Sequence, residues 1–414
     1  MLKPLPRLQP SYYETFRCVG AECEDTCCRG WRIPVDKDTF EKYQACSDAV
    51  LGPKLRELVN INPNRHGDES YAEIKMTSDC AFFSDGLCDI HATLGEEYLC
   101  KNCATYPRVM CSVEGILERS LDLSCPEAAR LALTNPEPMR FVEASGEGDE
   151  ARLGTVGLID TGNLRCPDRP YRYPGEVRRV IIELLENRKY SLRQRILALG
   201  RLCETLEAEG DEEGCDSLRE IALQCGPIRE SLPMCSTARF ETAVELILAR
   251  IGSDATGRRF LDCYRDFMGG LHWTGESSIE DLAARLDAAY SGPYAQFRAA
   301  HGYMLENYLV AYVFRTLFPF GADSVNKKMT EFGFIHSIAH QYQLMVVNFV
   351  VIDTVLAGLS AFHGASFGVP EALKLMQSAC KTFEHSLTYP GKALELLAGK
   401  GLLDCSSMGM LLRD

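Results

Sequence analysis

Cysteines are the residues of this sequence whose spacing points most directly to chemistry. The chain of 414 residues holds 19 cysteines, and eleven of them precede residue 126. A first group, Cys18, Cys23, Cys27 and Cys28, falls within eleven residues. Adjacent Cys27 and Cys28 cannot form a disulfide with each other without strain, whereas soft thiolates readily bind zinc or an iron–sulfur cluster. This group therefore predicts a metal centre.

A second group of cysteines follows further along the chain. Cys80 and Cys88 flank Gly86, which lets the chain turn tightly, and Cys100 and Cys103 come next. The spacing favours these ligands, in descending order: Cys23, Cys27, Cys28, Cys80, Cys88, Cys103, Cys18 and Cys100. Zinc and a four-iron cluster each need about four protein ligands, so some of these thiols are packed or serve another site. Which four cysteines bind stays open.

The choice between zinc and iron also depends on spacing. All-zinc structural sites usually present paired C-x2-C knuckles, and only Cys100 and Cys103 have that spacing here. This favours a [4Fe-4S] cluster, with zinc as the alternative. Cys23 and Cys27 begin the C-x3-C-x2-C pattern of radical enzymes that use S-adenosylmethionine, but position 30 is Gly30.

The remaining cysteines have no convergent spacing, and we interpret them as small hydrophobic residues. They are Cys46, Cys111, Cys125 and the eight cysteines from Cys166 onward. His91, three residues past Cys88, could ligate through its imidazole, although a histidine at the surface or at the edge of a core is the favoured interpretation.

The sequence divides into parts that must position these groups. Residues 1–134 are rich in turn signals and cysteines and predict a loop-rich domain that binds a metal or an iron–sulfur cluster. Residues 135–174, rich in Pro, Gly and charge, predict a linker or exposed loop. Residues 175–414 have helical periodicity with little strand alternation. We therefore expect a mainly α fold, in which a cysteine-cluster domain precedes a larger helical domain.

Several helices can be placed in the second part. Ser191 and Gln194 predict a capping box at the start of one helix. Other helices are expected over about 239–251, 256–270, 278–290, 295–317, 329–362 and 370–399. The stretch from Leu344 to Ala361 has the length and hydropathy of a membrane span. A core helix is expected instead, because an ionised Asp353 would be costly in lipid.

Composition narrows the classes of partner and location. The formal net charge of −14, from 58 acidic and 44 basic residues, argues against nucleic acid as a partner. The first residues contain no apolar run of signal-peptide length. The cysteines are clustered in one part of a large chain, unlike the disulfides of small secreted domains. A reducing cytoplasm is therefore expected.

Several motifs together resemble the flagellin lysine-N-methylases. The sharpest is FRCVGAECEDTCCRGW over residues 16–31, followed by Ile33 and Asp36. The further motifs that resemble that family lie at residues 80–88, 94–99, 103–108, 306–309 and 314–320. The resemblance spans most of the chain, with its most specific motifs before residue 110.

The resemblance implies transfer of methyl groups from S-adenosylmethionine to lysine side chains of flagellin, with a bound [4Fe-4S] cluster. The family belongs to a wider group of cysteine domains described as chelating zinc or iron. Carried onto this chain, it makes these residues the candidate cluster ligands: Cys18, Cys23, Cys27, Cys28, Cys80, Cys88 and Cys103. Cys100 is not part of the family pattern.

This chemistry requires a base, because a lysine amine is protonated at neutral pH and must lose a proton before it attacks a sulfonium methyl group. Asp36, Tyr106 and Glu306 lie in family-like motifs. The favoured interpretation of each is structural: a cap, a core hydroxyl or a solvated acid. The sequence therefore names no catalytic base.

The cofactor site also stays open, because the chain has no G-x-G-x-G loop between a strand and a helix. S-adenosylmethionine would lie either beside the cluster, with its amino and carboxylate groups on an open iron, or in a pocket between the two domains. Trp31, Tyr106 and Arg108 could pack on an adenine or bind a carboxylate. Shielding the metal loop from water is the favoured role for all three.

Two other classes of function compete with the enzyme. In the first, zinc or iron only folds the front domain, and the helical domain binds a partner. In the second, the cluster transfers electrons. The modified lysines, the choice between polar and radical transfer, and the oligomeric state are not determined by the sequence.

Overall fold

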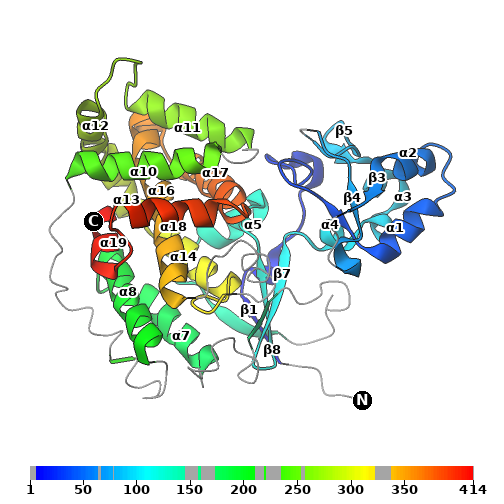
Figure 1. The fold of residues 1–414 in the computed structure, drawn as a ribbon, viewed down its shortest axis with the longest axis horizontal. Coiled ribbons are helices and arrows are strands. Elements are labelled where there is room, and N and C mark those ends of the chain that lie inside the picture. Colours follow the sequence, from blue (N-terminus) through cyan, green and yellow to red (C-terminus); the bar gives the residue numbers. More distant parts are fainter. Residues whose placement is uncertain are drawn as a thin grey trace.

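The computed structural model describes residues 6–63, 67–77, 79–144, 157–159, 173–209, 219–220, 235–252, 257–321 and 337–413. A small N-terminal lobe lies beside a larger helical body, and a β-sheet lies between them (Figure 1). The expected mainly α fold is confirmed. The N-terminal helices are α1 (Lys37–Gln44), α2 (Leu51–Leu58), α3 (Asp89–Leu94), α4 (Lys101–Thr105) and α5 (Pro126–Leu133).

The helical body contains eleven further helices in the described part of the chain. They are α7 (Pro174–Leu185), α8 (Leu192–Glu209), α10 (Ser236–Ile251), α11 (Arg258–Gly270), α12 (Ile279–Ser291), α13 (Pro293–His301), α14 (Tyr303–Arg315), α16 (Ile338–His363), α17 (Val369–Ala379), α18 (Tyr389–Gly399) and α19 (Cys405–Leu411). The predicted capping box at the start of α8 is confirmed: the Gln194 amide donates to Ser191 Oγ over 3.3 Å, and the Ser191 amide donates to Gln194 Oε1 over 2.9 Å.

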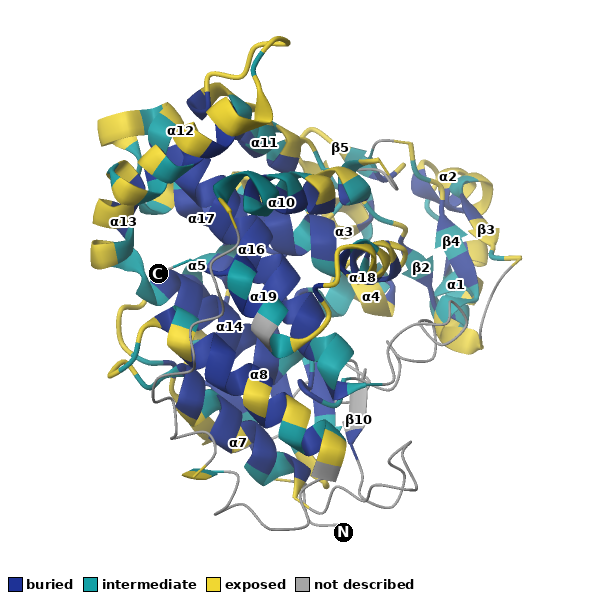
Figure 2. Cartoon of the chain, turned by 60° about the vertical axis from the view of Figure 1, so that its left-hand side comes forward, coloured by how far each residue is buried: buried dark blue, intermediate teal, exposed yellow. Residues whose placement is uncertain are grey.

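Helix α16 is the core helix of the body. It is apolar around its whole circumference and lies among buried helices such as α14 and α8 (Figure 2). Residues Ile338–Ser366 have the length and hydropathy of a membrane span, but 94% of the apolar window is buried inside the protein. Asp353 in this helix accepts hydrogen bonds from Tyr290 (2.9 Å) and Tyr294 (2.6 Å), which satisfy its carboxylate without a cation. The predicted core helix is confirmed.

Helices α11 and α16 cross at close range because glycines face each other there. A Cβ atom added at Gly270 would lie 2.1 Å from the Gly358 carbonyl oxygen, and one added at Gly358 would lie 2.3 Å from the Phe267 ring. No larger residue fits at either position without moving a backbone or a buried ring.

Two helices that the sequence predicts as continuous are interrupted in the structure. The expected helix 295–317 is divided at Gly302 into α13 and α14. A Cβ at Gly302 would lie 2.6 Å from the Arg298 carbonyl oxygen, so the chain closes tightly there. The expected helix 370–399 is α17, then a π-helical turn over Cys380–Glu384, then α18. The first part of the predicted helix 329–362, residues 329–336, lies outside the described residues. So do most of the predicted linker and the cysteines Cys166, Cys215 and Cys225.

Ten strands form three sheets in the part of the chain that the structure describes. They are β1 (Arg7–Pro10), β2 (Pro34–Val35), β3 (Val59–Ile61), β4 (Ala72–Ile74), β5 (Phe83–Ser84), β6 (Leu87–Cys88), β7 (Arg108–Val113), β8 (Ile116–Leu121), β9 (Phe141–Ala144) and β10 (Gly157–Ile159). The five-stranded sheet has the order β10-β7-β8-β1-β9, in which β7 pairs with β8 antiparallel and Arg108 faces Leu121. The order β2-β4-β3 makes a small sheet in the lobe.

The lobe and the body have separate hydrophobic cores. The core of the lobe draws only on residues between Ile33 and Cys100, with Cys103 packed at its edge. Leu123 and the apolar face of α5 belong to the core of the helical body instead. Residues 108–134, expected in the cysteine domain, therefore form sheet strands and a helix that join the two parts.

Candidate functional site at the junction of the two parts

The two cysteine groups lie side by side in the structure. The Cys80 amide donates to the Cys28 carbonyl oxygen over 2.8 Å, and Arg29 in the next position pairs with Asp79 at 2.8 Å. The predicted tight turn at Gly86 is confirmed: Asp85 and Gly86 have φ of 48° and 82° and join β5 to β6. Such left-handed pairs favour two-residue hairpins, and this hairpin places Cys88 opposite Phe83.

Five thiols share the first neighbourhood: Cys28, Cys80, Cys88, Cys100 and Cys103. Burial, with a smaller contribution from the nearby Cys28, Cys88 and Cys100 thiols, raises the pKa of Cys80 to about 12. Cys100 and Cys103 hydrogen-bond each other at the start of α4, and this bond lowers the pKa of Cys100 and raises that of Cys103. Cys100, outside the family pattern, is therefore fully within this group.

A second neighbourhood adjoins the first through the pair Cys27 and Cys28. A hydrogen bond between these two thiols raises the pKa of Cys27 and lowers that of Cys28. Cys18 and Cys23 also lie close enough to raise the pKa of Cys27. Burial, with a smaller contribution from Cys23 and Cys18, raises the pKa of Cys125 to about 11. Cys125, expected as a plain core residue, thus borders this second group.

The donor chemistry suits a soft metal, because the thiols are free and gathered on the edge of an apolar core. As they stand, no three Cys, His, Asp or Glu side chains of the described residues are placed to hold a metal ion together. The His91 side chain is exposed, and its backbone N–H, like that of Ile90, donates to the Cys88 sulfur. His91 therefore contributes to this region through its backbone.

Trp31 connects residues 18–28, the cysteine loop, to the helical body. Its indole N–H donates to the Cys27 carbonyl oxygen over 2.9 Å. Its ring packs on Tyr106 (5.3 Å between centroids) and His385 (5.1 Å), and the Lys381 ammonium lies 4.9 Å from the ring centroid. Aromatic and cationic groups from three distant segments thus meet beside the thiols.

Lys381 and Gln377 fasten the loop to α17 and its π-helical turn. Lys381 Nζ lies 3.0 Å from both Asp25 Oδ1 and the Thr26 carbonyl oxygen, and Gln377 donates to Asp25 Oδ2 over 2.9 Å. The side chains of Lys381 and Asp25 are only 8% and 14% exposed. A buried ion pair with further hydrogen bonds fixes this geometry, because either charge alone would be uncompensated.

His385 and Asp122 form a dyad at the same place. The imidazole Nε2 lies 3.2 Å from Asp122 Oδ1, and the Asp122 carboxylate also accepts the Ser124 N–H (2.9 Å) and faces Arg315 (3.4 Å). Burial opposes the charged imidazole, but the Asp122 charge and hydrogen bond outweigh it and raise the pKa of His385. The His385 side chain remains 35% exposed. The dyad is an oriented base that solvent can reach.

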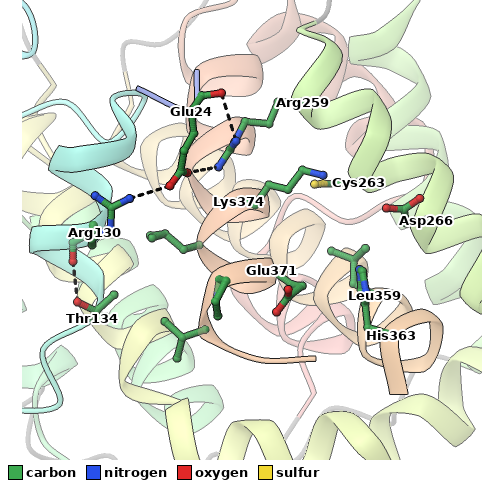
Figure 3. A pocket seen from close by; sticks show the side chains of 13 residues that line it. Glu24, Arg130, Thr134, Arg259, Cys263, Asp266, Leu359, His363, Glu371 and Lys374 are labelled. Carbon is green, nitrogen blue, oxygen red and sulfur yellow. Dashed lines mark hydrogen bonds and ion pairs between the residues drawn. The ribbon is translucent and has the colours of Figure 1, made fainter. Parts of the chain in front are cut away.

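A cavity of about 660 Å³ lies beside Glu24 of the cysteine loop. Glu24 of the loop forms part of its wall, where it pairs with Arg130 (2.9 Å) and Arg259 (2.7 Å) (Figure 3). Helices α5, α11, α16 and α17 supply the rest. Glu24 is thus the one residue of the cysteine loop in a cavity otherwise lined by helices of the body.

Comparison with known proteins identifies the family of the helical body. The family model for the FliB lysine N-methylase C-terminal domain matches residues 178–411. The chain belongs to this lysine N-methylase family. The resemblance seen in the sequence is thereby confirmed, and the family supports a lysine methyltransferase role.

The relatives share a shorter stretch. The flagellar biosynthetic protein FliU of Salmonella muenchen is 32% identical over 146 residues, which are 34% of this chain and 85% of that protein. Lysine-N-methylases of Salmonella typhimurium and Salmonella choleraesuis are each 30% identical over 146 residues, and the match spans 36% of their length. No solved structure matches the chain.

The matched FliB domain supplies the helical half of the junction, including Lys381, His385 and the walls of the cavity on α11 and α17. Sequence reasoning missed His385 and Asp122. They stand 263 positions apart, and no spacing rule links them. The π-helical turn that ends beside His385 is equally invisible to helical periodicity; such turns often mark functional sites.

The acids considered as bases from the sequence have structural roles. Asp36 caps α1 and accepts N–H groups of Thr39 and Lys101, each at 3.0 Å, and these bonds lower its pKa against the effect of burial. Glu306 is buried between Arg188 (2.8 Å) and Arg195 (2.7 Å).

The two other residues considered for the site also have partners within the protein. The Tyr106 hydroxyl lies 2.9 Å from Ser124 Oγ, and Arg108 packs over the Phe16 ring at 5.2 Å. The Tyr106 hydroxyl is thus used within the protein, and the Arg108 guanidinium is held over an aromatic ring.

Proposed function

We propose that this protein transfers methyl groups from S-adenosylmethionine to lysine side chains of flagellin in the cytoplasm. The membership in the lysine N-methylase family and the flagellar name of one relative support the substrate class. The observation that carries the proposal is the His385–Asp122 dyad, in which a buried carboxylate orients a partly exposed imidazole that packs on Trp31. A protein of net charge −14 also suits a partner that presents lysines.

The thiols at the junction would hold the metal centre. Four of the seven cysteines of the family pattern would bind a [4Fe-4S] cluster, with zinc as the alternative. The five thiols around Cys28 and Cys80 are the best-gathered set, and Cys100 belongs to it. When bound with four cysteine ligands, such a cluster would accept or donate an electron beside the loop.

His385 would act as the proton acceptor in methyl transfer. With Nε2–H directed at Asp122, Nδ1 carries the lone pair that takes a proton from the lysine ammonium. The freed Nζ lone pair then forms a bond to the sulfonium methyl carbon. The carbon–sulfur bond breaks, its electron pair stays on sulfur, and S-adenosylhomocysteine leaves. Asp122 holds the imidazole and stabilises the imidazolium that forms.

The direct test incubates the anaerobically purified full chain with flagellin and methyl-labelled S-adenosylmethionine, followed by mass spectrometry of flagellin lysines. We expect label on lysine with the unaltered chain. For His385→Gln we expect the methylation rate to fall by a factor of about 10² or more. His91→Gln, an exposed histidine of the lobe, is the matched control and should behave as the unaltered chain.

Each alternative function gives a different result in this experiment. A colourless zinc protein that binds no S-adenosylmethionine would be an interaction module. A reversible cluster potential without label on flagellin would indicate an electron carrier. Equal rates for His385→Gln and the unaltered chain would remove the histidine from the mechanism.

A further inference from the structure

The cavity beside Glu24 is a candidate ligand site in its own right. Its volume of about 660 Å³ lies within the range of small-molecule sites. Figure 3 shows Glu24 held between the guanidinium groups of Arg130 and Arg259, while Lys374 extends from α17 toward Cys263 on α11. Helices, loop and charged side chains thus line one partly open cavity.

Two cationic groups of the cavity have unused donors. Lys374 has no hydrogen-bond or ion-pair partner among the described residues, although its charge and that of Arg259 reach the Cys263 thiol. The Nε–H of Arg259 is buried without an acceptor. The buried Arg259 donor is costly to leave unsatisfied, and the half-buried Lys374 adds a second positive charge, so an anionic group such as a carboxylate suits this pair.

The cavity also presents anions, and these narrow the ligand class. Glu371 caps α17 by accepting the Gly368 N–H (2.9 Å), and Asp266 lies 3.4 Å from Arg265 at the surface. Together the wall carries three carboxylates and three fixed cations: Glu24, Asp266, Glu371, Arg130, Arg259 and Lys374. A phosphate or polyanion would meet the carboxylates unfavourably, whereas a zwitterion with an ammonium beside a carboxylate meets both signs.

The cavity and the junction site lie along one face of the same helix. One helix face carries Lys374, Gln377 and Lys381, because positions i, i+3 and i+7 of a helix point to the same side. Gln377 and Lys381 bind Asp25, the neighbour of Glu24. From Lys374 to Lys381 the rise is about 10 Å at 1.5 Å per residue. An extended molecule of nucleoside and amino acid spans such a distance.

We infer that this cavity binds the amino-acid end of S-adenosylmethionine, with Lys374 and Arg259 facing its carboxylate and Asp266 facing its ammonium. The inference rests on the proposed function and deepens it. It places the amino-acid end in a pocket between the two parts of the chain and not on an iron of the cluster.

Binding calorimetry on the intact, metal-loaded chain tests the inference with two probes. S-adenosylhomocysteine carries the amino-acid end, and 5′-methylthioadenosine lacks it. We expect Lys374→Met to weaken S-adenosylhomocysteine binding about tenfold or more and to leave 5′-methylthioadenosine binding unchanged. Lys374→Arg should retain most of the affinity. Lys54→Met, on α2 in the lobe, is the control and should bind both probes normally.

The outcomes separate this inference from the proposed function. Unchanged S-adenosylhomocysteine affinity in a folded Lys374→Met variant, or equal loss of both probes, would overturn the assignment of the cavity while methyl transfer to flagellin could still stand. Failure of the unaltered chain to bind either probe and to label flagellin would overturn the proposed function, and the inference with it.

Discussion

The protonation state of His385 depends on its partner Asp122. The imidazole must be neutral to accept a proton, so the rate should rise with pH through the pKa of His385. Asp122 holds that pKa above its ordinary value of 6.5. Replacing Asp122 by Asn removes the negative charge and lowers the pKa. The acidic limb of the kcat/KM profile should therefore move to lower pH, by about one unit, while the maximal rate falls.

The check is a pH–rate profile of methyl transfer for the unaltered chain and Asp122→Asn, with Glu143→Gln on the exposed face of β9 as the control carboxylate. A profile that keeps its acidic limb in Asp122→Asn would show that His385 does not control the rate. Arg315 stays paired with Glu384 in this variant, so no isolated cation is left behind.

Single functional residues can be predicted from the sequence where their type and spacing alone indicate a role. Cys27 and Cys28 stand out because adjacent thiols have few structural uses, and Gly86 does so because hairpins need a left-handed pair. His385 could not be found in this way. Its role depends on Asp122 and Trp31, which only the folded chain brings to it.

At the scale of elements, the crossing of α11 and α16 supports the wall of the cavity. Gly358→Ala would drive a methyl group against the Phe267 ring, so we expect a loss of about 1–3 kcal/mol in unfolding free energy. The measurement is urea unfolding followed by circular dichroism. Gly175→Ala in α7 is the matched control, because nothing lies within 4 Å of the added atom.

The control should be neutral or gain up to about 1 kcal/mol, since alanine favours helix over glycine. If Gly358→Ala were as stable as Gly175→Ala, the two helices would not approach as closely as described.

Helical periodicity predicts the helices that have one clear apolar face and a cap. The start of α8 at Ser191 is an example. Periodicity fails where two helices follow each other without a polar break, as at Gly302. It also fails at the π-helical turn Cys380–Glu384, because one extra residue leaves the apolar pattern nearly intact.

For the whole molecule, the sizes of the two cores differ. The lobe core contains far fewer buried side chains than the body core, and several of them are cysteines. Small lobes commonly depend on a bound metal for stability. We expect that removing the metal with a chelator under reducing conditions opens residues 33–105 to protease, while the body from α7 onward stays resistant.

Limited proteolysis with mass spectrometry of the fragments measures this directly, and the metal-loaded chain is the reference. Equal protection of the lobe with and without metal would show that the thiols do not fold it. The two-part organisation itself follows from cysteine spacing and helical periodicity. The sheet and α5 between the parts do not, because strands of this length carry little periodic signal.

The central claim is that sulfur atoms from both cysteine stretches bind one iron–sulfur centre at the junction. Iron and acid-labile sulfide analysis of anaerobically purified chains tests it most directly. We expect about four iron atoms and four sulfides per unaltered chain, and loss of most of the iron and sulfide in Cys28→Ser and in Cys80→Ser. The control Cys46→Ser should keep its full iron and sulfide content, because Cys46 lies in the same lobe core but outside both cysteine groups. Full iron and sulfide in Cys28→Ser and Cys80→Ser, or none in the unaltered chain, would contradict it.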